Sequence, residues 1–134
     1  MVTLKYSALR SDVFRVAMVK LASCQMDAET SAKFLELAKE LENCLRASQV
    51  EWVDLLKPNC ETENDKFKLN ADNSDFAWLA GVEPGLMRAK IMEFANKDVI
   101  LDKYEPVKVK LGDVKFSPVE LSALDPIVSI QIEP

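Results

Sequence analysis

Residues 27–57 read DAETSAKFLELAKELENCLRASQVEWVDLLK, and this segment determines how the remainder of the chain is organised. Apolar or small side chains recur along it at alternating steps of four and three: Phe34, Ala38, Leu41, Leu45, Ser48, Trp52 and Leu55. The spacing predicts one helix that lays a single face against other elements. At 1.5 Å per residue this helix would be roughly 46 Å long, more than a compact domain of this size is wide. Part of its face must therefore meet something besides a small globular core.

The ends of this helix and the chain before it follow from local signals. Lys57 should be its last residue, because the residue before Pro58 is pushed out of the helical region. Residues 2–7 alternate apolar and polar side chains, which is the period of a half-buried strand. Ser11 or Asp12 then caps a first helix, whose apolar face holds Phe14, Met18 and Leu21. The break that follows is short, so we expect the long helix to fold back antiparallel on the first.

Residues 58–74 interrupt the helical pattern with acidic and asparagine side chains. We expect an acidic, solvated loop here, with a possible short strand at residues 67–69. The acids do not form a calcium loop, because no Asp-x-Asp-x-Asx-Gly run is followed by a bidentate Glu.

A broken third helix is predicted over residues 75–96. Ser74 can cap its first part, and Gly81 with the Glu83-Pro84-Gly85 run interrupts it. Proline suits the first turn of the second part. That part places Met87, Ile91 and Phe94 on one face.

The final third of the chain has the composition of strands. Residues 99–101 and 107–111 are rich in β-branched side chains, and Gly112 can turn the chain toward a further strand at 114–116. Ser117, Pro118 and Glu120 then have the spacing of a capping box that opens a very short helix.

The tail at residues 127–132 alternates apolar and polar residues again. It can form a strand of the domain's own sheet or a strand offered to a neighbouring chain. Together these patterns predict an α+β fold in one domain over 1–134. An antiparallel helical hairpin occupies 1–57, the acidic loop 58–74, and a broken helix plus a small, mostly antiparallel sheet 75–134.

Composition narrows the functional classes. The formal net charge of −5 argues against general nucleic-acid binding, which needs a concentrated basic surface. No apolar run is long enough to span a membrane, and the first residues lack the apolar core of a signal peptide. We therefore expect a protein that is not secreted and stays in a cytosol.

Histidine is absent, which removes the commonest general base and metal ligand. The three cysteines, Cys24, Cys44 and Cys60, are widely spaced and read as reduced, packed side chains rather than as a redox or metal site. Enzyme chemistry would have to use carboxylates or lysines, and no cluster for it is visible. We expect no catalytic residues, no cofactor and no metal.

Contacts with other proteins are the remaining class. Trp52 and Leu55 lie at the end of the long helix that the first helix does not reach, so they are either core or a partner-binding surface, and tryptophan is frequent in interface hot spots. The apolar residues of the tail, Val128, Ile130 and Ile132, are candidates for pairing with a neighbour. The partner could be another subunit or a second copy of the chain.

The end of the chain also resembles a known family. Residues 99–128, VILDKYEPVKVKLGDVKFSPVELSALDPIV, combine a Lys-rich strand pair with a Ser-Pro-x-Glu-Leu-x-x-Leu-x-Pro element. The positions that carry it are Ser117, Pro118, Glu120, Leu121, Leu124 and Pro126. This segment resembles the closing part of small uncharacterised proteins of tailed bacteriophages, and the opening LKYSAL at residues 4–9 also fits; the middle, with the Gly81 to Gly85 break, departs from the pattern.

The resemblance implies a phage origin, with a location in the infected host's cytoplasm and possibly in the virion. The first functional expectation is a non-enzymatic head, neck or tail accessory subunit that works through protein–protein contacts. The alternative is an early phage protein that binds and inhibits a host or defence enzyme, since an acidic surface can compete for a basic site. A carboxylate enzyme is a third reading, which requires a concave pocket with two converging acids.

Overall fold

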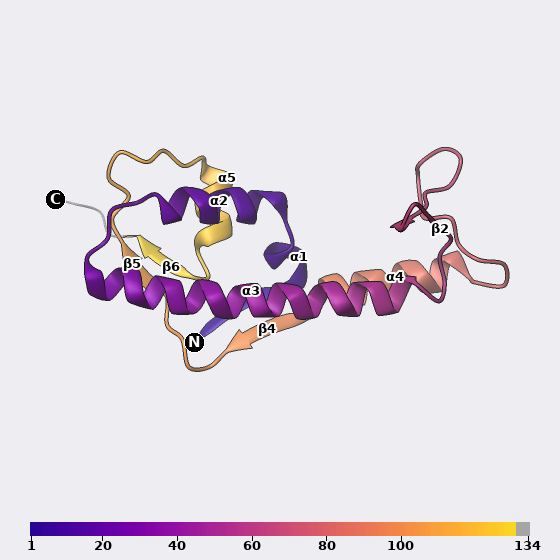
Figure 1. Cartoon of the computed structure of the whole chain (residues 1–134), viewed down its shortest axis with the longest axis horizontal. Helices are drawn as coiled ribbons and strands as arrows, with labels where there is room; N and C mark the ends of the chain where they lie inside the picture. The colour runs from indigo at the N-terminus through magenta and orange to yellow at the C-terminus, as the bar shows by residue number, and fades with distance from the viewer. Residues whose placement is uncertain (131–134) are drawn as a thin grey trace. The chain divides into compact units, whose positions relative to one another are not determined.

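The computed structural model of the chain describes residues 1–130 (Figure 1). In chain order its elements are β1 (Val2–Lys5), α1 (Tyr6–Leu9), α2 (Asp12–Ala22), α3 (Ala28–Leu56), β2 (Thr62–Glu63), β3 (Lys66–Phe67), α4 (Pro84–Ala95), β4 (Asp98–Leu101), β5 (Val107–Val109), α5 (Pro118–Leu124) and β6 (Val128–Ile130). Helices and short two-stranded sheets are mixed, so the predicted α+β class is confirmed.

The chain forms two compact units. Unit 1 combines Met1–Leu45 with the chain from Asn96 onward, and unit 2 is Arg46–Ala95. Helix α3 supplies its first part to unit 1 and its last part to unit 2. The unit boundaries therefore fall inside α3 and after α4, and not at the ends of the predicted acidic loop. That the whole chain is one domain stays a prediction.

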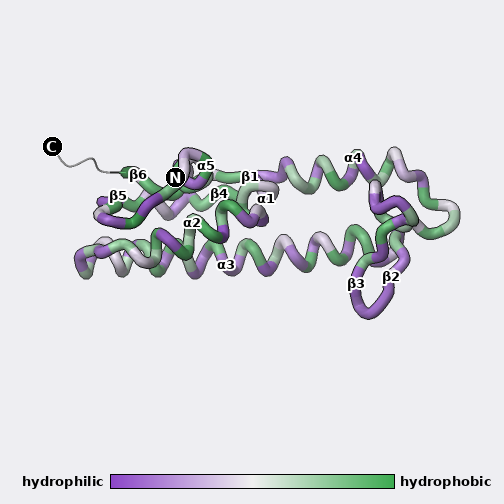
Figure 2. Tube along the Cα trace, turned by 90° about the horizontal axis from the view of Figure 1, so that it is seen from above, coloured by the Kyte–Doolittle hydropathy of each residue, from purple (hydrophilic) through white to green (hydrophobic). Residues whose placement is uncertain are grey.

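Helix α3 confirms the long helix, and its buried residues lie on the predicted face. Its first turn is capped by Asp27, whose Oδ1 accepts the backbone N–H of Thr30 at 2.7 Å. The buried residues are Phe34, Leu37, Leu41, Ser48 and Leu56. Leu45 lies on the same face, eleven residues and about 20° of rotation after Phe34, yet it is 39% exposed. It is the last residue of the first segment of unit 1, directly before unit 2 begins. Figure 2 shows the alternation of hydrophobic and hydrophilic residues along α3.

Unit 1 begins with strand β1, which pairs antiparallel with β4 in the register Val2↔Leu101 and Lys5↔Asp98. The single turn α1 follows directly and was not predicted. The Ser11 cap of α2 is confirmed, since its side chain accepts the backbone N–H of Phe14 at 3.1 Å. Helix α2 turns back through a short connection and runs antiparallel beside the first part of α3, as predicted (Figure 1), and it packs most extensively against α5.

Strands β5 and β6 form a parallel pair, in the register Val107↔Val128 and Val109↔Ile130, and β4 pairs with β1. The mostly antiparallel sheet predicted within residues 75–134 is therefore wrong in its strand pairing, although the α+β class holds. Parallel neighbours need a long crossover, which the loop after β5 and helix α5 supply. The predicted strand at 114–116 is wrong: Gly112, at φ +60°, turns the chain as expected, but the chain then runs irregularly to α5. The predicted capping box of α5 is confirmed.

The core of unit 1 is built from both ends of the sequence. Its buried apolar residues are Val2, Leu4, Tyr6, Leu9, Phe14, Ala17, Leu21, Cys24, Phe34, Leu37, Leu41, Val99, Leu101, Val107, Val109, Leu124, Ile127 and Val128. Several of these side chains are fully enclosed, among them Leu21, Leu124 and Ile127.

Unit 2 has a smaller core, in which Leu56, Cys60 and Met87 are buried. The acidic loop forms a tight hairpin, β2 with β3, whose turn residues Asn64 and Asp65 have φ of +53° and +61°. Two positive φ values in succession are those of a type I′ turn, whose twist suits a hairpin. The loop is therefore more ordered than predicted.

The first part of the predicted broken helix is wrong. Residues 75–80 are extended: Phe76 forms a β-bridge with Leu69, and Trp78 forms one with Cys60. The alternation of Phe76 and Trp78 with smaller residues is a strand pattern, and the helix reading overlooked it. Helix α4 begins at Pro84 and ends at Ala95, as predicted for the second part.

Candidate interaction surfaces

Four aromatic side chains gather on the core of unit 2. The Trp52 ring lies 5.4 Å from that of Phe94 and 6.0 Å from that of Phe76, measured between centroids. Phe76 in turn lies 5.5 Å from Trp78. All four are only partly buried. The aromatic cluster thus joins α3, the extended segment 75–80 and α4, and it keeps some aromatic surface in contact with solvent.

The sequence predicted Trp52 and Leu55 as partner-binding residues. Trp52 is part of the aromatic cluster, and Leu55 lies beside the core on which the cluster packs. Leu55 is partly buried and packs against the Leu56, Cys60 and Met87 core. Their first role is therefore packing within unit 2. That they also bind a partner stays a prediction, which their remaining exposure allows.

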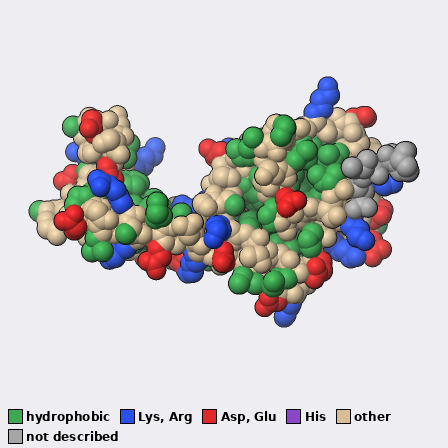
Figure 3. Space-filling model, turned by 180° about the vertical axis from the view of Figure 1, so that it is seen from behind, with side chains coloured by type: hydrophobic (Ala, Val, Ile, Leu, Met, Phe, Trp, Pro, Cys, Tyr) green, Lys and Arg blue, Asp and Glu red, His purple; other side chains and the backbone are tan. Residues whose placement is uncertain are grey.

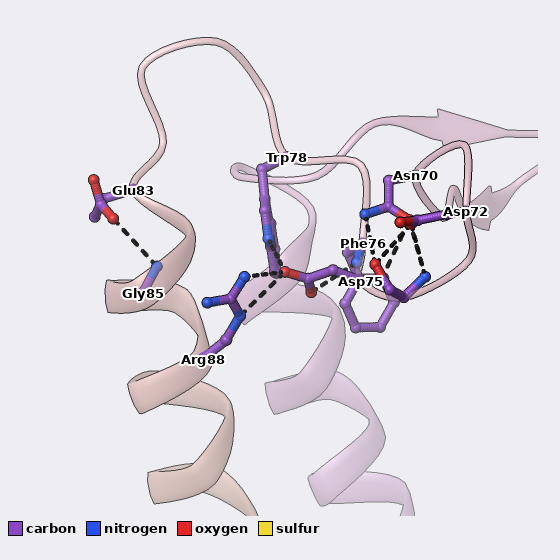
Figure 4. A network of polar contacts seen from close by, with 9 residues as sticks. Asn70, Asp72, Asp75, Phe76, Trp78, Glu83, Gly85 and Arg88 are labelled. Atoms are coloured by element: carbon purple, nitrogen blue, oxygen red, sulfur yellow. Dashed lines mark hydrogen bonds and ion pairs between the residues drawn. The ribbon is translucent and has the colours of Figure 1, made fainter.

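Asp75 fixes the aromatic cluster through its carboxylate (Figure 4). Its Oδ1 accepts the backbone N–H of Phe76 at 2.8 Å, and its Oδ2 accepts the indole N–H of Trp78 at 3.2 Å. The guanidinium of Arg88 on α4 donates to the same Oδ2 from Nε at 3.3 Å and from Nη2 at 3.1 Å. One carboxylate therefore ties the extended segment to α4.

These bonds favour the charged form of Asp75. The backbone N–H of Phe76 lowers the pKa of this carboxyl most, and the Trp78 indole and Arg88 lower it further. The side chain of Asp75 is 19% exposed, against 66% for Arg88. All three donors lie in unit 2, so the ionised carboxylate of Asp75 ties parts of this unit together.

A second polar turn precedes this tie. The Oδ1 of Asn70 accepts the backbone N–H of Ser74 at 3.0 Å. The Oδ1 of Asp72 accepts the hydroxyl of Ser74 at 2.7 Å, and this contact lowers the pKa of Asp72. Asn73 takes the left-handed conformation, with φ of +57°. The acidic and asparagine residues of this segment are thus used for turns.

The outer side of α3 in unit 2 carries an apolar strip. Val50 is 60% exposed and lies opposite Trp52, because two residues correspond to about 200° of helix rotation. A shallow depression of about 310 Å³ lies there, lined by Arg46, Gln49, Val50, Val53 and Asp54. These five residues are called the Val50 face below.

Helix α4 has a comparable outer side. Leu86 is 55% exposed and Met92 is 67% exposed, although Met87, next to Leu86, is buried. Each helix of unit 2 therefore has apolar side chains on its core side and on its outer side. The sequence analysis did not identify these outer residues, because it searched for the one apolar side of each helix that repeats with the helical period.

In unit 1, strand β6 holds the other predicted partner-binding residues. Val128 is buried, and Ile130 is partly buried and pairs in register with Val109. A depression of about 660 Å³ runs beside the strand, between Pro106, Leu121, Asp125 and Ile130. Figure 3 shows hydrophobic side chains gathered on one face of this unit. Ile132 lies outside the described residues, and binding of a neighbour by this strand stays a prediction.

Glu120 joins α5 to α2 in a way that the sequence did not indicate. Its Oε1 accepts the Lys20 ammonium at 2.7 Å and the backbone N–H of Ser117 at 2.8 Å. These two donors, Lys20 first, lower the pKa of Glu120. The capping-box pattern explains only the second contact. The ammonium of Lys20 on α2 thus reaches a carboxylate whose side chain is 10% exposed.

Chemistry within residues 1–130 is sparse. No group of three or more Cys, Asp or Glu side chains in this range could hold a metal ion. The three cysteines are free thiols, and burial raises the pKa of each. A raised thiol pKa lowers the thiolate fraction and hence nucleophilicity at neutral pH.

A further depression in unit 1 has a mixed lining. It measures about 730 Å³, and its charged residues are Glu29, Lys33, Glu36, Lys103, Glu105 and Lys108. Lys33 pairs with Glu29 at 3.2 Å, and Glu105 pairs with the N-terminal ammonium of Met1 at 2.6 Å. Two of the three acids are thus engaged with cations, which does not match the pair of converging carboxylates that a carboxylate enzyme needs.

Among the described helices, none is long and apolar enough to cross a membrane. Comparisons of the chain with protein-family models, with curated proteins and with solved structures find no match.

Proposed function

We propose that this protein works without catalysis, through contacts with other proteins, as an accessory subunit of a tailed-phage virion or of its assembly. The observation that carries the protein-contact part is the surface of unit 2. Val50, Leu69, Leu79, Leu86 and Met92 are each more than a third exposed, while only Leu56, Cys60 and Met87 form its buried apolar core. A unit that exposes this much apolar surface for its size gains stability from a partner.

The aromatic cluster supports the same proposal. Partly exposed Trp78 is held in place by the Asp75 carboxylate and the Phe76 ring, and partly exposed Trp52 by the Phe76 and Phe94 rings. Rigid aromatic side chains that keep accessible area are the usual anchors of interfaces, because little side-chain entropy remains to be lost on binding. The phage setting rests on the resemblance of residues 99–128 and on nothing else.

Mass spectrometry of purified virions tests the proposal. The phage that encodes this chain should yield virions that contain it in a fixed ratio to the major capsid protein after a salt wash. A matched preparation from a phage with the reading frame deleted is the control. Absence from washed virions and from assembly intermediates would rule out the accessory-subunit role.

The second candidate is an early phage protein that binds and inhibits a host enzyme. The net charge of −5 favours it, because an acidic surface can occupy a basic nucleic-acid site. The protein would then accumulate early in infection and stay out of virions. Its complex with the host enzyme would weaken steeply as salt is raised, whereas an apolar subunit contact would not.

A further inference from the structure

The Val50 face carries opposite charges at equal distances on the two sides of Val50. Along α3 the order is Arg46, Val50 and Asp54, so a cation and an anion lie one helical turn before and after an exposed apolar side chain. Val53 widens the apolar strip, and Gln49 borders it. All five residues line one shallow depression, and all but the partly buried Val53 are exposed.

We infer that the Val50 face docks onto the same face of a second copy of this chain, with the two α3 helices antiparallel and the twofold axis at Val50. In this register Arg46 of each copy lies opposite Asp54 of the other, and the two Val50 side chains meet. The contact is isologous, so each favourable charge pair occurs twice. This inference deepens the proposed function, and rests on it, by naming the partner as a second copy.

Charge selects this register over its neighbour. Sliding the helices by one step, so that Val50 meets Val53, would place Arg46 opposite Lys57 of the other copy. Like charges held opposite each other oppose binding, whereas the register centred on Val50 has opposite charges there. In that register Lys57 falls opposite Asn43, an uncharged residue. Of these two arrangements, the one centred on Val50 pairs opposite charges and the other pairs like charges.

The expected dimer is weak. A single pair of helical faces of about three turns buries less than the roughly 1,600 Å² of a standard stable interface. We expect a reversible monomer–dimer equilibrium in the micromolar range, visible when the concentration is varied. High salt should weaken it only slightly, because its centre is apolar and salt screens only the exposed flanking pairs.

Sedimentation equilibrium of the full-length chain and two surface variants tests the inference. Val50→Glu places two carboxylates at the twofold axis and should raise the dissociation constant by about tenfold or more. Val19→Glu makes the same change on the exposed side of α2, a 64% exposed position outside the proposed contact surface, and should leave the dissociation constant unchanged. Both positions are exposed, and circular dichroism with tryptophan fluorescence checks that each variant folds.

A charge exchange tests the register itself. Arg46→Glu alone sets a carboxylate of one copy against Asp54 of the other and should weaken the dimer, and Asp54→Arg alone should do the same by pairing two guanidinium groups. The double variant restores opposite charges and should recover wild-type dimerisation. A merely structural role for these residues would make the double variant worse than either single one, and that result would overturn the inference.

Two outcomes separate this inference from the proposed function. A chain that stays monomeric up to millimolar concentration, or one whose dimer is kept with Val50→Glu or is weakened equally by Val50→Glu and Val19→Glu, rules out the Val50 face as the self-contact. Neither result bears on the presence of the protein in virions. Conversely, absence from virions would leave a dimer of this geometry intact.

Discussion

Units 1 and 2 share helix α3, but different interactions stabilise the interior of each unit. Unit 1 encloses a large set of apolar side chains drawn from both ends of the sequence, and its parallel pair β5 and β6 is buried on the core side. Unit 2 has a small apolar core. Its chain path depends largely on polar contacts and turns: the Asn64–Asp65 turn, the Ser74 turn and the hydrogen bonds of Asp75. Burial of apolar area stabilises far more than exposed polar turns do.

The difference explains why the exposed apolar side chains matter in unit 2. A unit of its size that relies on turns gains little from its own core, so the proposed contact with a partner would add a large share of its stability. Both tryptophans, Trp52 and Trp78, lie in this unit, whereas Tyr6 and Tyr104 lie in unit 1. Tryptophan fluorescence therefore reports on unit 2 alone, and the comparison can be tested directly.

The largest expected effect is a cavity in unit 1. Leu21 is fully buried, and Leu21→Ala should lower the free energy of unfolding by about 3 to 4 kcal/mol, because the enclosed site cannot collapse. Met87→Ala in unit 2 should cost about 2 kcal/mol, since partly exposed neighbours can move into the space. Urea unfolding, followed by far-UV circular dichroism and by tryptophan fluorescence, gives both values. If both variants lose the same free energy of unfolding, the cores of the two units do not differ in how tightly they are enclosed.

The second prediction concerns acid stability. The pKa values of Asp75 and Glu120 are lowered in the folded chain, so each group contributes stability above its unfolded pKa of about 4 and loses it as the pH falls through the folded value. Asp75→Asn should therefore destabilise unit 2 at neutral pH. It should also make the free energy of unfolding of this unit depend less on pH below about pH 4. Tryptophan fluorescence during urea titrations from about pH 2 to 6 measures this.

Glu120→Gln is the matched control for that experiment. It removes a lowered carboxyl pKa in unit 1 and should leave the fluorescence-detected acid transition of unit 2 nearly unchanged. A shift as large as that of Asp75→Asn would mean that the two units unfold together as one cooperative structure.

Much of the helical structure could be predicted from the sequence because its signals are local. The cap at Ser11, the helix stop before Pro58 and the Ser117 capping box all depend on residues within one turn of each other, and the structure confirms them. The errors lie where a choice depends on distant partners. Residues 75–80 were read as a helix because their bridges to Cys60 and Leu69 are tertiary contacts.

The interaction surfaces were only partly predictable for the same reason. Trp52 was assigned from its position on a long helix, and it does lie at the edge of a small core. Asp75, Arg88 and the Lys20–Glu120 pair were missed, because residues brought together from separate elements leave no spacing to detect. The exposed Val50 was missed because a second apolar side of a helix does not disturb the main period.

The third prediction weighs a single cap in unit 1. Ser117→Ala removes the acceptor for the backbone N–H of Glu120 and should lower the free energy of unfolding by about 1 kcal/mol. Ser122→Ala, an exposed position inside the same helix, should be neutral or slightly stabilising because alanine has the higher helix propensity. Thermal unfolding by circular dichroism compares the two. Similar losses in both variants would mean that the cap contributes nothing beyond helix propensity.

The smallest expected effect is at the β2–β3 turn of unit 2. Asp65 has φ of +61°, a conformation that glycine adopts without strain, so Asp65→Gly should stabilise the hairpin by about 0.5 kcal/mol after the extra entropy of the unfolded glycine is subtracted. Asp65→Val should destabilise it, because a β-branched side chain opposes positive φ. If unit 2 depends on its turns, the fluorescence midpoint in urea will move in opposite directions for the two variants. If only local hydrogen exchange near residues 62–67 responds, the hairpin opens independently, and the stability of unit 2 must come from its aromatic cluster instead.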